Sequence, residues 1–210
     1  MSIYCIFVPC FILVTRSNRK NVDLPTGEKI EEELQAQGLV WNHTLQYLNS
    51  MSLKSAVELG IPVVLHRHDG PVSLTNLAAQ LSIPPNKTNS LRRLMRILVF
   101  TGYFASETNT GNDEAASYLL TPLSRHLIKD KDTGASPFVL FQLDPVFIPP
   151  LQTLAAWFRG NEPTPFSKMH GMEIFEMKER LNHVFNAAMA CDLRLVPKSL
   201  VEKHRDAFEG

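Results

Sequence analysis

The chain lacks the glycine spacings that nucleotide-binding loops require. A dinucleotide site or a P-loop brings backbone close to a phosphate at a strand-to-helix turn, and closely spaced glycines allow that approach. The sequence contains ten glycines, no two of them separated by a single residue, and no Gly-x-x-x-x-Gly-Lys run occurs. A dinucleotide or P-loop site is therefore not expected within these 210 residues.

Cysteine is scarce, and charge of one sign is not in excess. The three cysteines, Cys5, Cys10 and Cys191, are too scattered to predict a disulfide framework or a zinc site. We interpret them as reduced thiols of an intracellular, cytoplasmic protein. The 21 basic and 21 acidic residues cancel, which gives no support for general polyanion binding. The His66-x-His68-Asp69 run falls at a predicted helix end with a spacing that suits a metal poorly, so no metal is expected.

Long hydrophobic runs are also absent, apart from one short stretch near the N-terminus. Ile3 to Val14 is apolar except for Pro9, and it is too short to cross a bilayer as a helix. The cationic residues follow the run, whereas a signal peptide has them before it. The alternatives are a membrane anchor or signal and a non-core extension. We favour an extension over residues 1–27, with no membrane partner.

Helical periodicity begins at Glu28. One apolar stripe at three- and four-residue steps comprises Ile30, Leu34, Trp41, Leu45 and Leu48. A second helical stretch, Leu53 to Leu65, is interrupted by Gly60 and Pro62.

A helix-turn-helix pattern follows. The run Ser73-Leu74-Thr75-Asn76 is expected to form a cap that leads into a helix over Leu77 to Leu81. Asn86 or Thr88 is expected to cap a longer helix ending at Gly102. Two short apolar segments around a polar loop, Tyr103-Phe104-Ala105 and Tyr118-Leu119-Leu120-Thr121, predict a small β-hairpin. Three helices and a hairpin form a winged helix.

The second helix of this pair carries four basic residues: Lys87, Arg92, Arg93 and Arg96. Such a helix often enters the major groove of DNA. The alternative is the solvated face of a helix whose other face is core. The zero net charge favours the latter, so nucleic acid is not the expected partner.

Beyond Pro122 the pattern is helical again, most clearly over Leu151 to Phe158 and Leu181 to Leu195. Strand-like patterns are scarce, so no central sheet is expected. The predicted fold is mainly α: a winged-helix domain with a small β-hairpin, followed by a helical connector.

Several motifs resemble plant small-molecule O-methyltransferases, which methylate phenolic, flavonoid and alkaloid hydroxyls with S-adenosylmethionine. In order along the chain, they are Ser50 to Ile61, Leu91 to Arg96, Tyr118-x-Leu120-Thr121-Pro122-x-Ser124-Arg125, Phe166-x-x-x-His170-Gly171 and Phe185 to Arg194. The resemblance covers nearly everything after residue 28. It implies a winged-helix dimerisation domain at 28–130 and a helical substrate-pocket or connector segment at 131–210.

The resemblance also implies site residues. Leu181, Phe185 and Met189 lie at four-residue steps on one helix face, which periodicity alone predicts to be a core stripe. In the family, the positions of Phe185 and Met189 hold the acceptor ring beside the methyl donor. Phe141 and Gln142 match the far side of that pocket. Asp192, together with Phe185, is expected near the cofactor, whereas Leu193 replaces the usual small hydroxyl residue.

The family binds its cofactor in a Rossmann-like core, which also holds the catalytic histidine. No histidine of this sequence corresponds to that base, and we expect the core to be absent from this chain. The resemblance therefore implies a truncated O-methyltransferase that forms homodimers or heterodimers with related subunits, supplies part of a pocket for a small aromatic hydroxyl substrate, and is inactive alone. The alternatives are a non-catalytic interaction module and, more distantly, a winged-helix DNA-binding protein.

Overall fold

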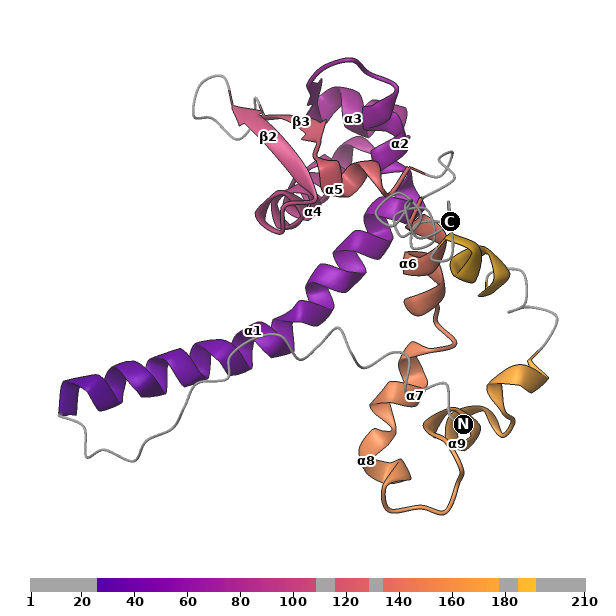
Figure 1. Cartoon of the computed structure of the whole chain (residues 1–210). Coiled ribbons are helices and arrows are strands. Elements are labelled where there is room, and N and C mark those ends of the chain that lie inside the picture. Colours follow the sequence, from indigo (N-terminus) through magenta and orange to yellow (C-terminus); the bar gives the residue numbers. More distant parts are fainter. Residues whose placement is uncertain (1–25, 109–115, 129–133, 178–184, 192–210) are drawn as a thin grey trace, which may run out of the picture. The chain divides into compact units, whose positions relative to one another are not determined.

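The computed structural model describes residues 26–108, 116–128, 134–177 and 185–191, with the backbone alone for 26–28 (Figure 1). The chain divides into two compact units, residues 1–44 and 45–210, and each is described by itself. The described residues are mainly helical and include one small sheet. None of the helices among them is long and apolar enough to cross a membrane.

The first helix is longer than the sequence pattern predicts. Helix α1 spans Thr26–Leu59 without interruption, so the expected start of a separate second helix at Leu53 is wrong. The break comes at Gly60, whose φ of 76° is a conformation that residues with a Cβ rarely adopt, and α2 (Ile61–His66) follows directly. Pro62 lies in the first turn of α2, where its missing N–H breaks no helical hydrogen bond.

The predicted helix-turn-helix is present, with one error in its caps. Ser73, within the run expected to form the cap, precedes α3 (Leu74–Gln80), and its side chain accepts a hydrogen bond from the Asn76 backbone N–H. The helix begins at Leu74, so the predicted start at Leu77 is wrong. The turn becomes a short 3₁₀ helix, η3 (Pro85–Lys87), which leads directly into α4 (Thr88–Phe100). Lys87 is therefore the N-cap of α4, without a side-chain cap, and the expectation of Asn86 or Thr88 is wrong.

The predicted hairpin is part of a three-stranded antiparallel sheet. Strands β2 (Phe104–Thr108) and β3 (Ala116–Leu120) pair with Phe104 opposite Leu120. A two-residue strand, β1 (Val72–Ser73), pairs with the other edge of β3, so the order is β1-β3-β2. Periodicity could not predict β1, because two residues are too few to show it.

Helices α2, α3 and α4 contact the sheet and enclose the main core (Figure 1). Its most deeply buried members are Ile61, Leu77, Met95, Leu98 and Phe104. Met95 and Leu98 are three residues apart on α4, so one helix face supplies both. This packing is the principal source of stability in unit 45–210.

The remaining described segments are short. They are α5 (Pro122–Arg125), α6 (Ser136–Gln142), α7 (Ile148–Gln152), α8 (Leu154–Trp157), α9 (Pro165–His170) and the 3₁₀ helix η5 (Ile174–Glu176). The helix predicted over Leu151 to Phe158 is instead divided at Thr153 between α7 and α8. Helices α7, α8 and α9 contact one another. Residues 185–191 are helical, inside the predicted stretch of Leu181 to Leu195, the rest of which lies outside the described residues.

Candidate functional site

Five rings from four segments form a continuous aromatic cluster in unit 45–210. Its members are Phe141, Phe147, Phe166, His170 and Phe185. The ring centroids of Phe141 and Phe185 are 5.5 Å apart at 69°, and those of Phe141 and Phe147 are 4.7 Å apart at 63°. Both pairs are edge-to-face, the arrangement that aromatic quadrupoles favour. Phe147 lies 6.2 Å from Phe166, which lies 4.4 Å from the His170 ring.

The structure brings together two of the residues that the sequence assigned to the acceptor pocket. Phe141 is buried on α6, and Phe185, half-buried, meets its ring from a segment more than forty residues later. Met189 lies one helical turn after Phe185 and is also half-buried. Leu181 and Asp192 lie outside the described residues.

Gln142 is the polar member of the predicted pocket. It ends α6 directly after Phe141, and its side-chain Nε2 is buried with no hydrogen-bond partner among the described residues. A buried amide donor without an acceptor costs about 1–3 kcal/mol. A ligand oxygen within reach of this Nε2 group would offset that cost.

His170 belongs to the same cluster but is held by the protein itself. Its Nε2 lies 3.0 Å from the carbonyl oxygen of Val146, which belongs to the loop between α6 and α7. Thr164 and Ser167 cap the start of α9 reciprocally, and Gly171, with a φ of 70°, ends it. His170 is thus hydrogen-bonded within the protein, at the end of a helix.

Sequence reasoning missed Phe147 as a member of the cluster. Phe147 is the residue before α7, in a proline-rich stretch with no apolar periodicity. Phe166 was recognised only as part of a family motif. The four-residue spacing between Phe166 and His170 is the one sequence pattern that could have shown that their two rings share a helix face.

An ion pair supports the helix that carries His170. The Lys168 Nζ donates to Glu162 Oε1 at 2.7 Å, and the Trp157 indole N–H donates to the Glu162 carbonyl oxygen at 2.7 Å. The hydrogen bond from the Lys168 ammonium lowers the pKa of Glu162 below its ordinary value of 4.5. The loop between α8 and α9 is thus tied to both helices.

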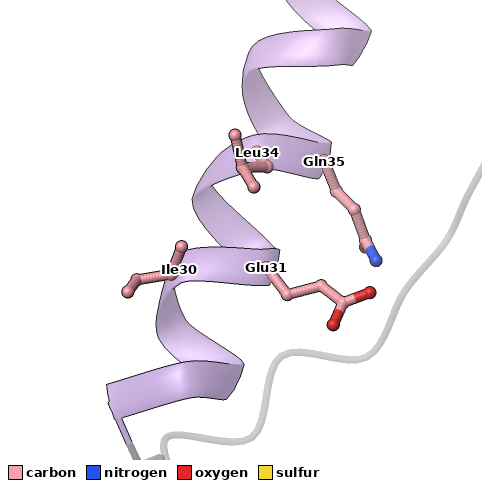
Figure 2. Close-up of a pocket in the computed structure, with 4 residues that line it drawn as sticks. All are labelled: Ile30, Glu31, Leu34 and Gln35. Carbon is pink, nitrogen blue, oxygen red and sulfur yellow. The ribbon is translucent and has the colours of Figure 1, made fainter.

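A pocket is also found on α1, in unit 1–44. Its described lining residues are Ile30, Glu31, Leu34 and Gln35, all from adjacent turns of one helix (Figure 2). Glu31 and Gln35 point to the same side, as their four-residue spacing requires. Side chains from a single helix cannot by themselves enclose a small molecule, so this pocket is a surface feature rather than a ligand site.

Comparison with known proteins defines the class to which this fold and site belong. Residues 41–130 match the O-methyltransferase dimerisation domain. The chain is 38% identical over 192 residues to trans-resveratrol di-O-methyltransferase of Vitis vinifera, covering 90% of this chain and 54% of the relative. It is 40% identical over 198 residues to 8-hydroxyquercetin 8-O-methyltransferase of Mentha piperita, covering 89% and 54%. The chain belongs to the plant small-molecule O-methyltransferases and spans about half the length of these relatives.

Solved structures show the same fold at lower identity. Human N-acetylserotonin methyltransferase in complex with S-adenosylmethionine matches with a TM-score of 0.66 and 21% identity, over 80% of this chain and 48% of that one. The mitomycin 7-O-methyltransferase matches with a TM-score of 0.62 and 23% identity, over 77% and 45%.

S-adenosylmethionine is the cofactor of this family. Of the residues assigned to it, Phe185 packs edge-to-face on Phe141, and Asp192 lies outside the described residues. The cluster around Phe185 is apolar, so it does not supply the polar groups that would hold the ribose and amino-acid ends of this cofactor. The described residues of the cluster therefore supply an apolar surface and not a complete cofactor site.

Proposed function

We propose that these residues provide the dimerisation surface and part of the acceptor pocket of an O-methyltransferase that transfers a methyl group from S-adenosylmethionine to a hydroxyl of a small aromatic plant metabolite. The contact between Phe141 and Phe185 carries the proposal. It joins two apolar rings at positions that the family resemblance assigns to the acceptor, and Gln142, the next residue after Phe141, carries a buried amide without a partner among the described residues. An aromatic ring fits this wall by edge-to-face packing, and an oxygen on that ring would accept from the amide.

The architecture assigned to this function has three parts. Residues 28–130 are a winged-helix dimerisation domain, supported by the order α2, α3, α4 and then the β2–β3 hairpin. Residues 131–210 are the connector with the acceptor wall, and 1–27 are a non-core extension. The proposed setting is the cytoplasm, and the partner is a second copy or a related methyltransferase subunit.

Methyl transfer by the 210-residue chain alone is expected to be negligible. The sequence lacks the glycine spacing of a cofactor loop and has no histidine that matches the family base. Since the chain spans about half of its relatives, the donor-binding residues are assigned to sequence outside it. We infer that pairing and acceptor binding are the functions that these 210 residues carry.

The test uses the purified chain, labelled S-adenosylmethionine and a panel of small phenols. The expected result is no methyl incorporation, with binding of a phenol detected by quenching of intrinsic fluorescence or by calorimetry. Phe141→Ala should weaken that binding, whereas Phe158→Ala, which removes an exposed ring outside the cluster, should not. Clear methyl incorporation by the chain alone would contradict the assignment of donor binding to sequence outside it, and equal phenol affinity in both variants would contradict the acceptor wall.

An interaction-only function is the second candidate, and one observation favours it. Helix α1 exposes large apolar side chains along its length, among them Trp41, which is 61% exposed. Exposed apolar faces of this kind mark protein contacts. If the chain pairs with an intact relative, its role is to change the activity of that subunit. Co-expression with a full-length methyltransferase would show this as a heterodimer with altered turnover.

A further inference from the structure

The outward face of α4 carries positive charge and an exposed aromatic ring. Arg93, Arg96 and Phe100 recur at three- and four-residue steps, opposite the buried Met95 and Leu98. Phe100 is 91% exposed, an unusual position for a phenylalanine. No ion pair in the described part of the chain involves Arg93 or Arg96.

This face borders a hollow, which we call the α4 groove. We define the α4 groove by Arg93, Arg96, Ile97 and Phe100, with Asn49 of α1 and Tyr118 of β3 at its sides. None of its described lining residues is a carboxylate. The groove is therefore cationic and partly apolar, and it would accept an apolar surface bordered by acidic side chains.

The N-terminal part of α1 has that character. Ile30 and Leu34 lie one turn apart and are 55% and 62% exposed. Glu31 and Glu33 lie on either side of this apolar pair, whereas Glu32 points to the opposite side of the helix. We call the stretch from Ile30 to Leu34 the acidic arm, and Figure 2 shows Glu31 beside its apolar face.

We propose that the acidic arm of one copy docks in the α4 groove of a second copy, a proposal that rests on the dimerisation proposed above. Ile30 and Leu34 pack on Phe100, while Glu31 and Glu33 pair with Arg93 and Arg96. Two arguments select a second copy as the occupant. The charges and apolar groups are complementary, and the family match over residues 41–130, which include the groove, is to a dimerisation domain.

A mutual exchange of acidic arms would fill the α4 grooves of both copies. Each copy carries one arm and one groove, so a two-fold arrangement fills both grooves with the same pair of contacts. The apolar contact supplies affinity, while the charges fix the orientation and oppose misaligned pairing. The net charge of the chain is zero although the α4 groove is basic. In the proposed dimer, the glutamates of the acidic arm balance the arginines of the groove.

Charge reversal tests the pairing. Arg93→Glu with Arg96→Glu is expected to raise the dimer dissociation constant by about tenfold or more, since an acidic arm would face an acidic groove. Glu31→Arg with Glu33→Arg should raise the dissociation constant similarly, because a basic arm would then face the basic groove. Mixing the two variants should restore dimers, because each heterodimer contains one native and one reversed pairing. Sedimentation over a range of concentrations measures this, and circular dichroism checks folding.

Glu32→Arg is the matched control, because it reverses a charge on the other side of the arm and should leave the dissociation constant unchanged. A dimeric wild type whose charge-reversed variants pair normally, or do not recover when mixed, would overturn the arm exchange and leave dimerisation standing. A wild type that is monomeric at every concentration would instead overturn dimerisation itself. Duplex DNA bound through Arg93 and Arg96, with the dimer unaffected by their reversal, would also overturn the exchange.

Discussion

Phe100 and Phe104 lie close in sequence on either side of Gly102 and have opposite environments. Phe104 is 1% exposed in the core between α4 and the sheet, whereas Phe100 is 91% exposed. Gly102, with a φ of 79°, turns the chain between the helix and the strand. Residue type alone does not distinguish the two rings. The turn places one of them in the core and leaves the other exposed.

Glu162 and Lys168 support a pH-dependent prediction at this scale. Lys168→Met is expected to lower the free energy of unfolding at neutral pH. The lowered pKa of Glu162 means that the pair stabilises the folded state above pH 4.5, and that this stabilisation is lost as the pH falls through the pKa of the folded state. The difference between wild type and variant should therefore decrease as the solution is acidified below pH 4.5. Urea unfolding at several pH values measures it.

Lys54→Met is a suitable comparison for this experiment. Lys54 faces Glu58 across one turn of α1 at 3.5 Å, a longer pair of the kind that contributes little. Its effect on unfolding should be smaller than that of Lys168→Met at neutral pH. A Lys168→Met variant whose deficit is the same at acidic and neutral pH would show that packing, not the ion pair, causes its loss of stability.

The residues of the candidate site were only partly accessible to sequence reasoning. The resemblance assigned Phe141 and Phe185 to one pocket, and the structure places their rings in contact. Phe147 and Phe166 complete the cluster, but nothing local to either residue shows that the two rings meet. Contacts of this kind depend on how separate helices pack, and a one-dimensional pattern does not contain that information.

Among the elements, α5 and the start of β2 are linked through a single side chain, that of Thr121. Thr121 precedes α5, and its Oγ1 accepts from the Ser124 N–H while donating to the Tyr103 carbonyl oxygen at 2.8 Å. Ser124 in turn accepts from the Thr121 N–H, which completes a capping box. One hydroxyl thus caps a helix and holds it against the first strand of the hairpin.

Thr121→Val should remove both functions without changing the side-chain volume greatly. We expect a loss of about 1–2 kcal/mol in the free energy of unfolding, because the cap and the hydrogen bond to the partly buried Tyr103 carbonyl are lost together. Thr101→Val is the control, since the Thr101 hydroxyl bonds only within its own helix, to the Ile97 and Leu98 carbonyl oxygens. Equal losses in the two variants, measured by denaturant unfolding, would contradict a special role for Thr121.

The helix boundaries show which element-level predictions succeed. Gly60 and Gly102 mark real ends because a positive φ stops a helix for a local reason. The division at Thr153 and the cap at Lys87 were not predicted: no glycine marks either position, and at Lys87 a 3₁₀ turn runs directly into α4. Local chemistry thus locates the breaks that glycine makes and misses the others.

At the scale of the whole molecule, the proposed dimer should respond to salt. The acidic arm and the α4 groove carry exposed charges, and the Debye length falls from about 10 Å at 0.1 M to about 3 Å at 1 M salt. The wild-type dimer is expected to weaken several-fold over that range, as measured by sedimentation. Arg93→Gln with Arg96→Gln should give a weaker dimer that is less sensitive to salt. A salt response that is unchanged in this variant would place the relevant charges elsewhere.

The sequence by itself determined the mainly helical class, the helix-turn-helix with its hairpin and the family, because periodicity, capping residues and motif order are local properties of the chain. It also showed an amphipathic α1. Only the tertiary structure decided that the apolar stripe of α1 is exposed, that Phe100 points outward and that Phe141 meets Phe185. The physical reason is that burial is a property of contacts between distant segments, whereas a periodic pattern shows that a face is apolar but not what covers it.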